Sequence, residues 1–284
     1  MAPPTFADLG KQARDLFGKG YNHGLVKVET TTRGNENGTV EFKTNTSHNL
    51  ATEKLAGNVD IKYKIPQHGL TLTEKWNTDG VLGTIVEINN QFARGLKATL
   101  DTSYTPNTGK RDALLKTEWA NENVKVNANL TLIGGPIANL SGVYSHNGIL
   151  FGVSNKYDLS TNESKTTSVA FGYEHPSYVI HSYTNDGREF GGSVYHKASV
   201  SKNVELGTQL GWVSGESKLS YAVGSNYRIS PDLILRAKVD SASNVGLGIV
   251  HSLSPNLKLY VSTLFGLTGG NSQNRLGAGL EFTA

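Results

Sequence analysis

The chain has 284 residues and no cysteine, so it can form neither disulfide bonds nor thiolate metal sites. It also lacks any run approaching the roughly 20 consecutive apolar residues that a membrane-spanning helix requires, and its mean hydropathy is -0.33. These absences exclude a disulfide-stapled fold and a helical membrane protein. A barrel of half-apolar strands stays open, because such strands average to a polar hydropathy.

Catalytic motifs are missing as well. Gly109-Lys110 is followed by Arg111 and lacks the upstream glycine of a phosphate-binding loop, and no Gly-x-Ser-x-Gly motif occurs. The eight histidines show no His-x-x-x-His spacing typical of a metal site. The sequence therefore predicts no enzyme active site, no cofactor and no bound metal.

The charge is nearly balanced, with 27 Lys and Arg against 24 Asp and Glu, and no basic stripe of the kind that binds nucleic acid. No shift of composition marks a linker, so we expect one domain behind an N-terminal segment. That segment lacks the apolar core of a secretory signal, and Asp8 and Asp15 are unlike a mitochondrial presequence. We expect it to be retained.

The N-terminal segment, residues 1–20, has the pattern of an amphipathic helix from Pro4 to Gly20. Its apolar residues recur at spacings of three and four and so share one face: Phe6, Leu9, Ala13, Leu16 and Phe17. Thr5 is predicted to cap the start, with Asp8 in the first turn. A helix of this length is marginal alone in water, so it needs a surface that covers its apolar stripe.

From Leu25 to the end, residues 25–284, the period of the pattern is two. Apolar and polar residues alternate, for example, in the stretches 96–101, 124–132, 203–212 and 275–282. Turn signals separate such stretches: Asn37-Gly38, Asp79-Gly80, Asn147-Gly148, Asp186-Gly187 and Gly269-Gly270-Asn271 are examples. Strands of about 10 residues with short turns give roughly 18 to 20 antiparallel strands.

So many strands in one meander predict a closed barrel. A soluble sandwich uses fewer strands with Greek-key crossovers, and a propeller would show a blade repeat of roughly 40 residues, which is absent. A barrel of this size encloses an aqueous lumen, so its polar faces point inward and its apolar faces meet lipid. The residues predicted to line water are Lys97, Lys125, Glu205, Arg236, Lys238, Lys258, Arg275 and Glu281.

The barrel supplies the surface that the helix needs. We expect the helix to lie against the inner wall, where Lys11, Arg14 and Lys19 would join Lys97 in a basic lumen that attracts anions. Residues 21–24 are predicted to be a hinge, with Gly18, Gly20 and Gly24 giving the chain its freedom to turn. The alternative is a helix lying on the membrane surface.

One acidic residue breaks the alternation. Leu70, Leu72, Glu74 and Trp76 share a strand face, which puts the Glu74 carboxylate on the lipid side. A charge there is costly, and such a residue is usually functional or paired. The alternative is a bulge or strand end that lets Glu74 reach the headgroups.

Several motifs together resemble one family from end to end: Pro3 to Lys11, Gly69 to Asp79, Ala93 to Lys97, Asn107 to Lys110, Asn185 to Ser193, Tyr227 to Gly248 and Gly279 to Phe282. The chain resembles the mitochondrial voltage-dependent anion channels, the eukaryotic porins of the outer membrane. The resemblance implies nineteen strands, closed by one parallel pair of the first and last strand. It also implies a pore helix tied to voltage gating and the passage of ATP, ADP, other metabolites and small ions.

Functional residues are implied in the same way. Lys11 and Lys19 match nucleotide contacts, and a further nucleotide region of the NAD-binding kind matches Asn244, Val245, Gly246, Ser262, Thr263, Leu264, Phe265 and Gly266. Glu74 matches the membrane-facing acid linked to gating and hexokinase binding. Bcl-2-type regulators, tubulin and a second copy of the chain are further partners implied by the resemblance.

The chain departs from the family pattern at two places. Asn22 and His23 replace a glycine and an aromatic residue of the hinge, and Asn244 stands where an aliphatic residue is common. Two other classes stay open: a soluble or bacterial-type β protein that binds a ligand, and a related eukaryotic barrel of the protein-import machinery. The quoted motifs favour the metabolite channel.

Overall fold

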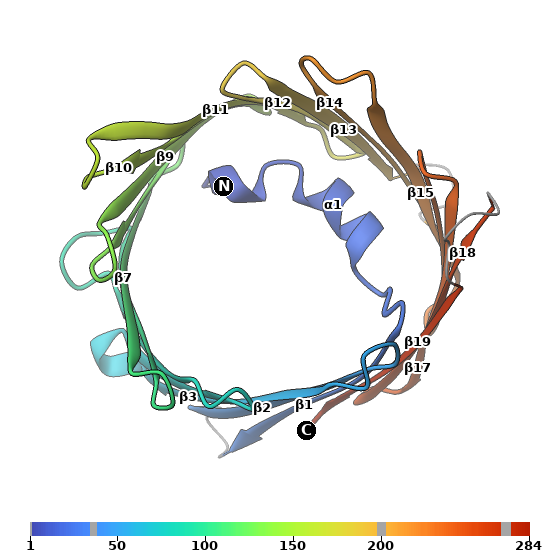
Figure 1. Cartoon of the computed structure of the whole chain (residues 1–284), viewed down its shortest axis with the longest axis horizontal. Helices are drawn as coiled ribbons and strands as arrows, with labels where there is room; N and C mark the ends of the chain where they lie inside the picture. Colours follow the sequence, from blue (N-terminus) through green and yellow to red (C-terminus); the bar gives the residue numbers. More distant parts are fainter. Residues whose placement is uncertain (1, 35–38, 198–202, 268–273) are drawn as a thin grey trace.

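The computed structural model describes residues 2–34, 39–197, 203–267 and 274–284, so the predicted turns at Asn37-Gly38 and Gly269-Gly270-Asn271 lie outside the described residues. Nineteen strands are described, and they form one closed sheet (Figure 1). They are β1 (Leu25–Gly34), β2 (Val40–Asn49), β3 (Leu55–Ile65), β4 (Leu70–Asn77), β5 (Leu82–Asn89), β6 (Leu96–Thr105), β7 (Lys110–Ala120), β8 (Val124–Thr131), β9 (Ile137–His146), β10 (Ile149–Asp158), β11 (Glu163–Glu174), β12 (Tyr178–Asn185), β13 (Glu189–Lys197), β14 (Val204–Val213), β15 (Leu219–Ser230), β16 (Leu233–Asp240), β17 (Asn244–Ser254), β18 (Leu257–Gly266) and β19 (Arg275–Thr283).

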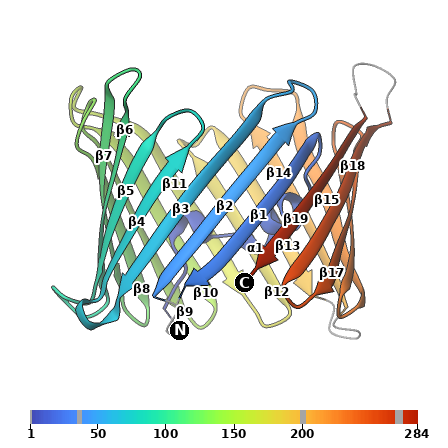
Figure 2. The same ribbon diagram turned by 90° about the horizontal axis from the view of Figure 1, so that it is seen from below.

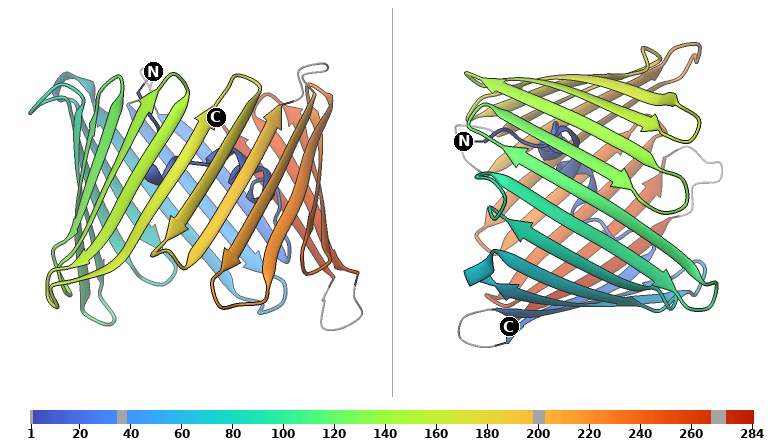
Figure 3. Two further views of the ribbon diagram at one scale, coloured as in Figure 1. Left: turned by 90° about the horizontal axis from the view of Figure 1, so that it is seen from above. Right: turned by 90° about the vertical axis from the view of Figure 1, so that its left-hand side faces the viewer.

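Successive strands run antiparallel, and the barrel closes where β1 pairs with β19 in parallel, from Val26 opposite Ala278 to Thr31 opposite Thr283. Parallel closure follows from the odd number of strands, because alternating directions leave the first and the nineteenth strand running the same way. Every strand has two neighbours, so the sheet has no open edge. Figures 2 and 3 show the strands inclined to the barrel axis. The predicted meander with one parallel pair is confirmed.

Tight turns join neighbouring strands at the predicted Asn-Gly and Asp-Gly pairs. Asn147 and Gly148 have φ angles of 48° and 83°, and Asp186 and Gly187 have φ angles of 51° and 63°. Two successive positive φ angles are the requirement of a type I′ turn, whose twist matches that of the strands it joins. These pairs connect β9 to β10 and β12 to β13.

Outside the register shifts at Lys156/Tyr157, Arg228/Ser230 and Ser252/Ser254, the register assigns each strand residue to one of two faces. Gly152 on β10 faces the lumen, because a side chain there would meet Leu9 and Phe6 of the N-terminal segment. Opposed residues on neighbouring strands share a face, and the face alternates along each strand. From Gly152, which lies opposite Val143 on β9, the pairing extends this assignment around the barrel.

The assignment confirms the predicted wet face. Facing the lumen are Lys97, Lys125, Glu205, Arg236, Lys238, Lys258, Arg275 and Glu281. The outer face carries exposed apolar side chains, among them Val28, Phe42, Ile61, Leu210 and Val223. An apolar belt around a polar interior is stable in lipid and unstable in water. The barrel therefore spans a membrane.

The N-terminal segment forms two short helices, and the prediction of one helix from Pro4 to Gly20 is wrong. A single 3₁₀ turn, η1 (Phe6–Asp8), precedes α1 (Lys11–Gly18). Between them Gly10 has a φ of 68°, a left-handed conformation that interrupts the helix. The break lies at a close contact, because a Cβ atom on Gly10 would come within 2.6 Å of the His181 Nδ1 atom. No helix in the described part of the chain is long and apolar enough to cross a membrane.

Both helices lie inside the barrel, part-way between its rims (Figures 1 and 3). The predicted apolar face is confirmed: Leu9 packs against Val143, Leu150 and Ala170, and Leu16 and Phe17 pack against Ala222. Burying such a side chain contributes roughly 1.5–3 kcal/mol. The inner wall is thus the surface that the amphipathic segment needs, and the placement on the membrane surface is excluded.

Candidate functional site in the lumen

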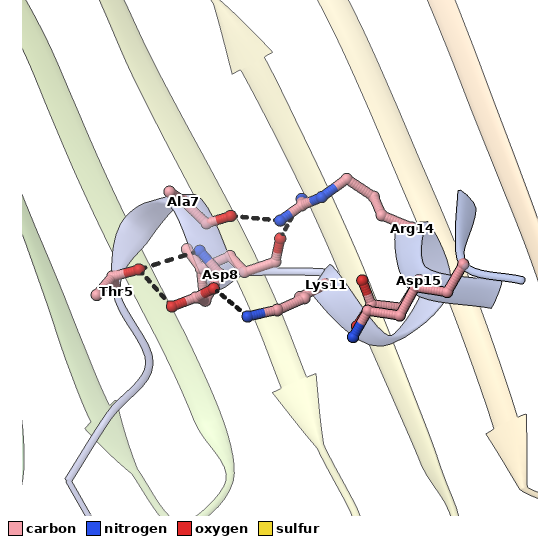
Figure 4. A network of polar contacts seen from close by, with 8 residues as sticks. Thr5, Ala7, Asp8, Lys11, Arg14 and Asp15 are labelled. Atoms are coloured by element: carbon pink, nitrogen blue, oxygen red, sulfur yellow. Dashed lines mark hydrogen bonds and ion pairs between the residues drawn. The ribbon is translucent and has the colours of Figure 1, made fainter. Parts of the chain in front are cut away.

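A polar network holds the start of the N-terminal segment (Figure 4). The Thr5 hydroxyl accepts a hydrogen bond from the Asp8 backbone N–H over 3.2 Å and donates one to Asp8 Oδ2 over 2.7 Å, which confirms the predicted cap. Lys11 Nζ lies 3.0 Å from Asp8 Oδ1. The Thr5 hydrogen bond, aided by Lys11, lowers the pKa of Asp8. Lys11 is therefore a half-exposed cation whose charge a carboxylate balances.

Arg14 behaves differently from the other predicted cations. Its guanidinium donates to the carbonyl oxygens of Leu9, over 2.6 Å, and of Ala7. These contacts span the break at Gly10 and hold η1 against α1, as Figure 4 shows. No carboxylate in the described chain forms an ion pair with Arg14. Its full charge therefore acts on the lumen.

The two remaining predicted cations form ion pairs. Lys19 Nζ lies 2.7 Å from Oδ2 of Asp15, which is four residues earlier in the preceding helical turn. Lys97 Nζ on β6 lies 3.1 Å from Glu87 Oε1 on β5, which is its neighbour across the strands. A paired cation adds a dipole and little net charge to the field. Among the four predicted anion contacts, Arg14 thus has the strongest long-range effect.

The linker after α1 is fastened to the wall by its backbone. The Asn22 N–H donates to Ser262 Oγ over 2.8 Å, and the Gly24 N–H donates to the Leu276 carbonyl over 2.8 Å. Gly20 and Gly24 have φ angles of 78° and 74°, so the chain turns at two of the three predicted hinge glycines. Gly18 is the last residue of α1, and a Cβ atom there would meet no atom of the described residues within 4 Å.

Two cations of β16 bind the end of α1. Lys238 Nζ donates to the Phe17 carbonyl over 2.7 Å and lies 4.2 Å from the centre of the Tyr21 ring. Arg236 Nη1 donates to the Lys19 carbonyl over 2.5 Å. The last carbonyls of a helix carry partial negative charge, so cations placed there stabilise it. Alternation had placed both residues in the lumen, but nothing in the sequence connected them with the helix.

Tyr21 and His23 of the linker are enclosed between these cations and the wall. Burial, aided by the charges of Lys238 and Arg275, lowers the pKa of His23 to about 4. Burial raises the pKa of Tyr21 to about 12. Neither ring nitrogen of His23 has a hydrogen-bond partner among the described residues. The imidazole is therefore held neutral beside two positive charges.

The predicted nucleotide region forms one patch of wall. Asn244 lies opposite Gly266 and Val245 opposite Phe265, so the two predicted segments are neighbours on β17 and β18. Five of these positions face the lumen: Asn244, Gly246, Ser262, Leu264 and Gly266. Val245, Thr263 and Phe265 face outward, and the linker covers Ser262. The luminal side chains open to a solute are accordingly fewer than the motif suggests.

Glu74 lies on the outer face of β4, as the alternation predicted. It pairs across the strands with Ile61 and Thr84, and the Thr84 hydroxyl donates to Glu74 Oε2 over 2.9 Å. Ile61 on one side and Trp76 further along β4 are exposed apolar neighbours. The carboxylate therefore has one hydroxyl partner, beside exposed apolar side chains. It is set well inside β4, and no bulge interrupts the pairing of β4.

Comparison with known proteins agrees with this architecture. A family model described as Eukaryotic porin matches residues 2–277. The chain is 51% identical over 282 residues to a Caenorhabditis elegans "Probable voltage-dependent anion-selective channel", with 99% of each chain covered. It is 41% identical over 286 residues to the Homo sapiens "Non-selective voltage-gated ion channel VDAC1", again with 99% of each chain covered. A Drosophila melanogaster "Voltage-dependent anion-selective channel" is 39% identical over 100% of both chains.

These names support an ion channel over the alternative of an import barrel. The match covers the barrel and the luminal segment alike. This chain belongs to the eukaryotic porin family.

Proposed function

We propose that this protein is a voltage-gated, weakly anion-selective channel of the mitochondrial outer membrane. It passes ATP, ADP, other metabolites and small ions. The observation that carries the proposal is a closed, wet lumen in which, among the described residues, cations outnumber carboxylates and a charged helix rests on the wall. The names of its relatives support the same function.

Selectivity arises from the sum of luminal charges. Several luminal acids are already matched by lysines, as in Lys97 with Glu87 and Lys116 with Asp101. Within the described residues, Lys27, Lys62 and Lys64 form no ion pair with a carboxylate, although all three face the lumen. Such a surplus raises the local concentration of anions without binding them tightly. A wide pore with a modest surplus gives weak anion selectivity.

Adenine nucleotides would interact with this surplus through their phosphates. We propose that Lys11, Arg14 and Lys19 of the N-terminal segment and Lys97 on the wall form weak phosphate contacts. The luminal positions among Asn244, Val245, Gly246, Ser262, Thr263, Leu264, Phe265 and Gly266 form a second contact region. It lies beside the linker, so a bound nucleotide there would touch both wall and linker.

Voltage acts on the charged luminal segment. Lys11, Arg14 and Lys19 belong to an element held to the wall by packing and a few hydrogen bonds, with no covalent link to the wall beyond the hinge at Gly18, Gly20 and Gly24. A field across the membrane exerts a force on such charges. Displacement of the segment would change both the free cross-section and the luminal charge, and so lower conductance.

The outer wall is proposed to bind partners. Glu74 is the contact for hexokinase and a gating element, since an acid in the lipid belt is a costly feature that a bound partner can compensate. Bcl-2-type regulators, tubulin and a second copy of this chain are further proposed partners. Membrane lipids surround the exposed apolar belt.

A planar bilayer tests the proposed channel. Refolded protein is added under a salt gradient, and the reversal potential and the voltage response are recorded. A large pore that favours anions and steps to lower conductance at either polarity is expected. No pore, or an open state that strongly favours cations, would overturn the proposal. A pore that passes unfolded peptides in preference to nucleotides would favour an import barrel instead.

A further inference from the structure

A cavity of about 570 Å³ opens beneath the linker, between residues 18–22 and the strands β1, β16, β17, β18 and β19. Four basic residues line it: Lys19, Lys27, Arg236 and Lys258. Two acids, Glu29 and Glu281, line it as well. The residues come from opposite ends of the sequence and meet at the parallel seam of the barrel.

The acids in this cavity are already bound by other groups. Glu281 accepts hydrogen bonds from Tyr260, over 2.5 Å, and from Lys258, over 3.3 Å. Glu29 lies 3.9 Å from Lys43. In the described chain Lys27 and Arg236 form no ion pair with a carboxylate. The cavity therefore has positive charge that no protein carboxylate balances.

Arg236 is the best placed of these cations. One arm of its guanidinium binds the Lys19 carbonyl, while its Nε atom is buried and has no hydrogen-bond partner among the described residues. Gly20 lets the guanidinium pack this closely against the linker, because a Cβ atom on residue 20 would lie 2.9 Å from Arg236 Nε. A buried N–H without a partner is unfavourable, and the free donors of a guanidinium match the oxygens of a phosphate.

We propose that this cavity binds a phosphate-bearing anion, and that Arg236 couples its occupancy to the docking of the luminal helix. The proposal rests on the proposed function and deepens it, since it names a position in the lumen and the residue that couples a bound anion to the helix. Phosphate fits better than carboxylate, because two cations without a carboxylate partner, Lys27 and Arg236, line the same cavity, and a chain of phosphates can contact both of them.

Coupling follows from the shared donor. The guanidinium holds the Lys19 carbonyl at the end of the segment, directly after α1. An anion that draws Arg236 toward the cavity weakens this hydrogen bond, which leaves Lys238 as the one remaining cation on the helix end among the described residues. Occupancy therefore loosens the end of α1, and the channel closes at lower voltage.

Inorganic tripolyphosphate is the probe. Its binding to refolded protein in detergent micelles is measured by titration calorimetry, and the closing voltage is recorded in a bilayer with and without it. We expect Arg236→Gln to weaken binding about tenfold and to abolish the shift in closing voltage. Arg236→Lys keeps the positive charge but loses the planar guanidinium with its several N–H donors. Its tripolyphosphate affinity and its shift in closing voltage should therefore lie between those of the parent protein and those of Arg236→Gln.

Lys62→Gln is the matched control, because Lys62 faces the lumen from β3, outside the cavity. It should reduce anion selectivity as Arg236→Gln does and leave tripolyphosphate binding unchanged. If Arg236→Gln does not refold, Lys27→Gln and Arg236→Lys provide the same test. If Lys62→Gln and Arg236→Gln lose the same amount of tripolyphosphate binding, the proposed site is wrong. Binding would then depend only on the total charge of the lumen.

The experiment separates this proposal from the proposed function. An open, anion-selective pore that tripolyphosphate neither binds nor shifts contradicts the cavity alone. A second result would be tripolyphosphate binding that depends on Arg236 while the open pore strongly favours cations. That result would support the proposed phosphate site and contradict the proposed anion selectivity. Binding without a shift of closing voltage overturns the coupling.

Discussion

Lys238 and Phe17 are 221 residues apart in sequence, yet the Lys238 ammonium donates a 2.7 Å hydrogen bond to the Phe17 carbonyl. The same ammonium lies over the Tyr21 ring at 4.2 Å. One side chain of β16 therefore binds both the end of α1 and the linker that follows it. The contact satisfies a helix carbonyl that has no partner within the helix, and it uses a cation where the helix dipole favours one.

Lys238→Met tests the strength of this contact. The hydrogen bond and the contact with Tyr21 should together contribute roughly 1–2 kcal/mol to docking. Hydrogen exchange at the amides of α1 should then be about 5- to 30-fold faster than in the parent protein. Lys62→Met removes a luminal lysine from the distant strand β3 and should leave exchange in α1 unchanged. Unchanged exchange in Lys238→Met would show that packing alone docks the helix.

Gly224 on β15 tests the packing itself. A Cβ atom there would lie 2.6 Å from Leu16 Cδ2 and 2.9 Å from Phe17 Cε1. Gly224→Val should push α1 off the wall at a cost of roughly 1–3 kcal/mol and lower the open conductance. Gly142→Val is the control, because Gly142 faces outward on β9 and a Cβ atom there would meet none of the described atoms within 4 Å. Equal conductance in both variants would contradict the contact.

Glu74→Gln tests the acid in the lipid belt. The amide keeps the shape and can still accept from Thr84, while the charge is removed. We expect a changed closing voltage or weaker hexokinase binding, with the open conductance nearly unchanged because Glu74 lies outside the lumen. The barrel should also resist urea slightly better in lipid vesicles, since a carboxylate in that belt is unfavourable. If gating, hexokinase binding and stability all match the parent, Glu74 has no special role.

The pKa of His23, about 4 against an ordinary 6.5, makes linker docking sensitive to acid. A docked pKa below the undocked value means that docking is fully favoured above pH 6.5 and loses this contribution as the pH falls through 4. The groups that face His23 are Lys238 on β16, Arg275 on β19 and Tyr21 on the linker, and the two cations repel an imidazolium.

Hydrogen exchange in residues 19–24, corrected for its intrinsic pH dependence, should therefore accelerate between pH 7 and pH 4.5. His23→Gln cannot gain a proton and should remove most of this change. The same acceleration in His23→Gln would assign the effect to another group. Constant protection across the range in the parent protein would also contradict the argument.

Lys97 and Glu87 test whether selectivity follows net luminal charge. Because they form an ion pair over 3.1 Å, Lys97→Gln leaves an unbalanced carboxylate and should make the pore less anion-selective. Glu87→Gln should change the reversal potential in the opposite direction, and the double variant should return close to the parent value. A double variant that stays as poorly selective as Lys97→Gln would make Lys97 a specific anion contact rather than part of a field.

The local periodicity of the sequence was sufficient to predict much of this structure. Alternation with period two predicted the strands and which face of each is wet, because both follow from the geometry of a single strand in lipid. Spacing of three and four likewise predicted the apolar face formed by Leu9, Ala13, Leu16 and Phe17. The outward position of Glu74 follows from the same alternation and needed no knowledge of its neighbours.

Other features depended on contacts that no local pattern encodes. The helix breaks at Gly10 because that residue lies against His181 of β12, and Lys97 loses its effect as a free charge because the register places it beside Glu87. Arg236 binds the Lys19 carbonyl across 217 residues. The sequence by itself determined the strands, their faces and the amphipathic segment, since these depend on periodicity. Only the closed barrel decided which charges are paired and where the helix is held, because register and closure set the distances between residues far apart in the chain.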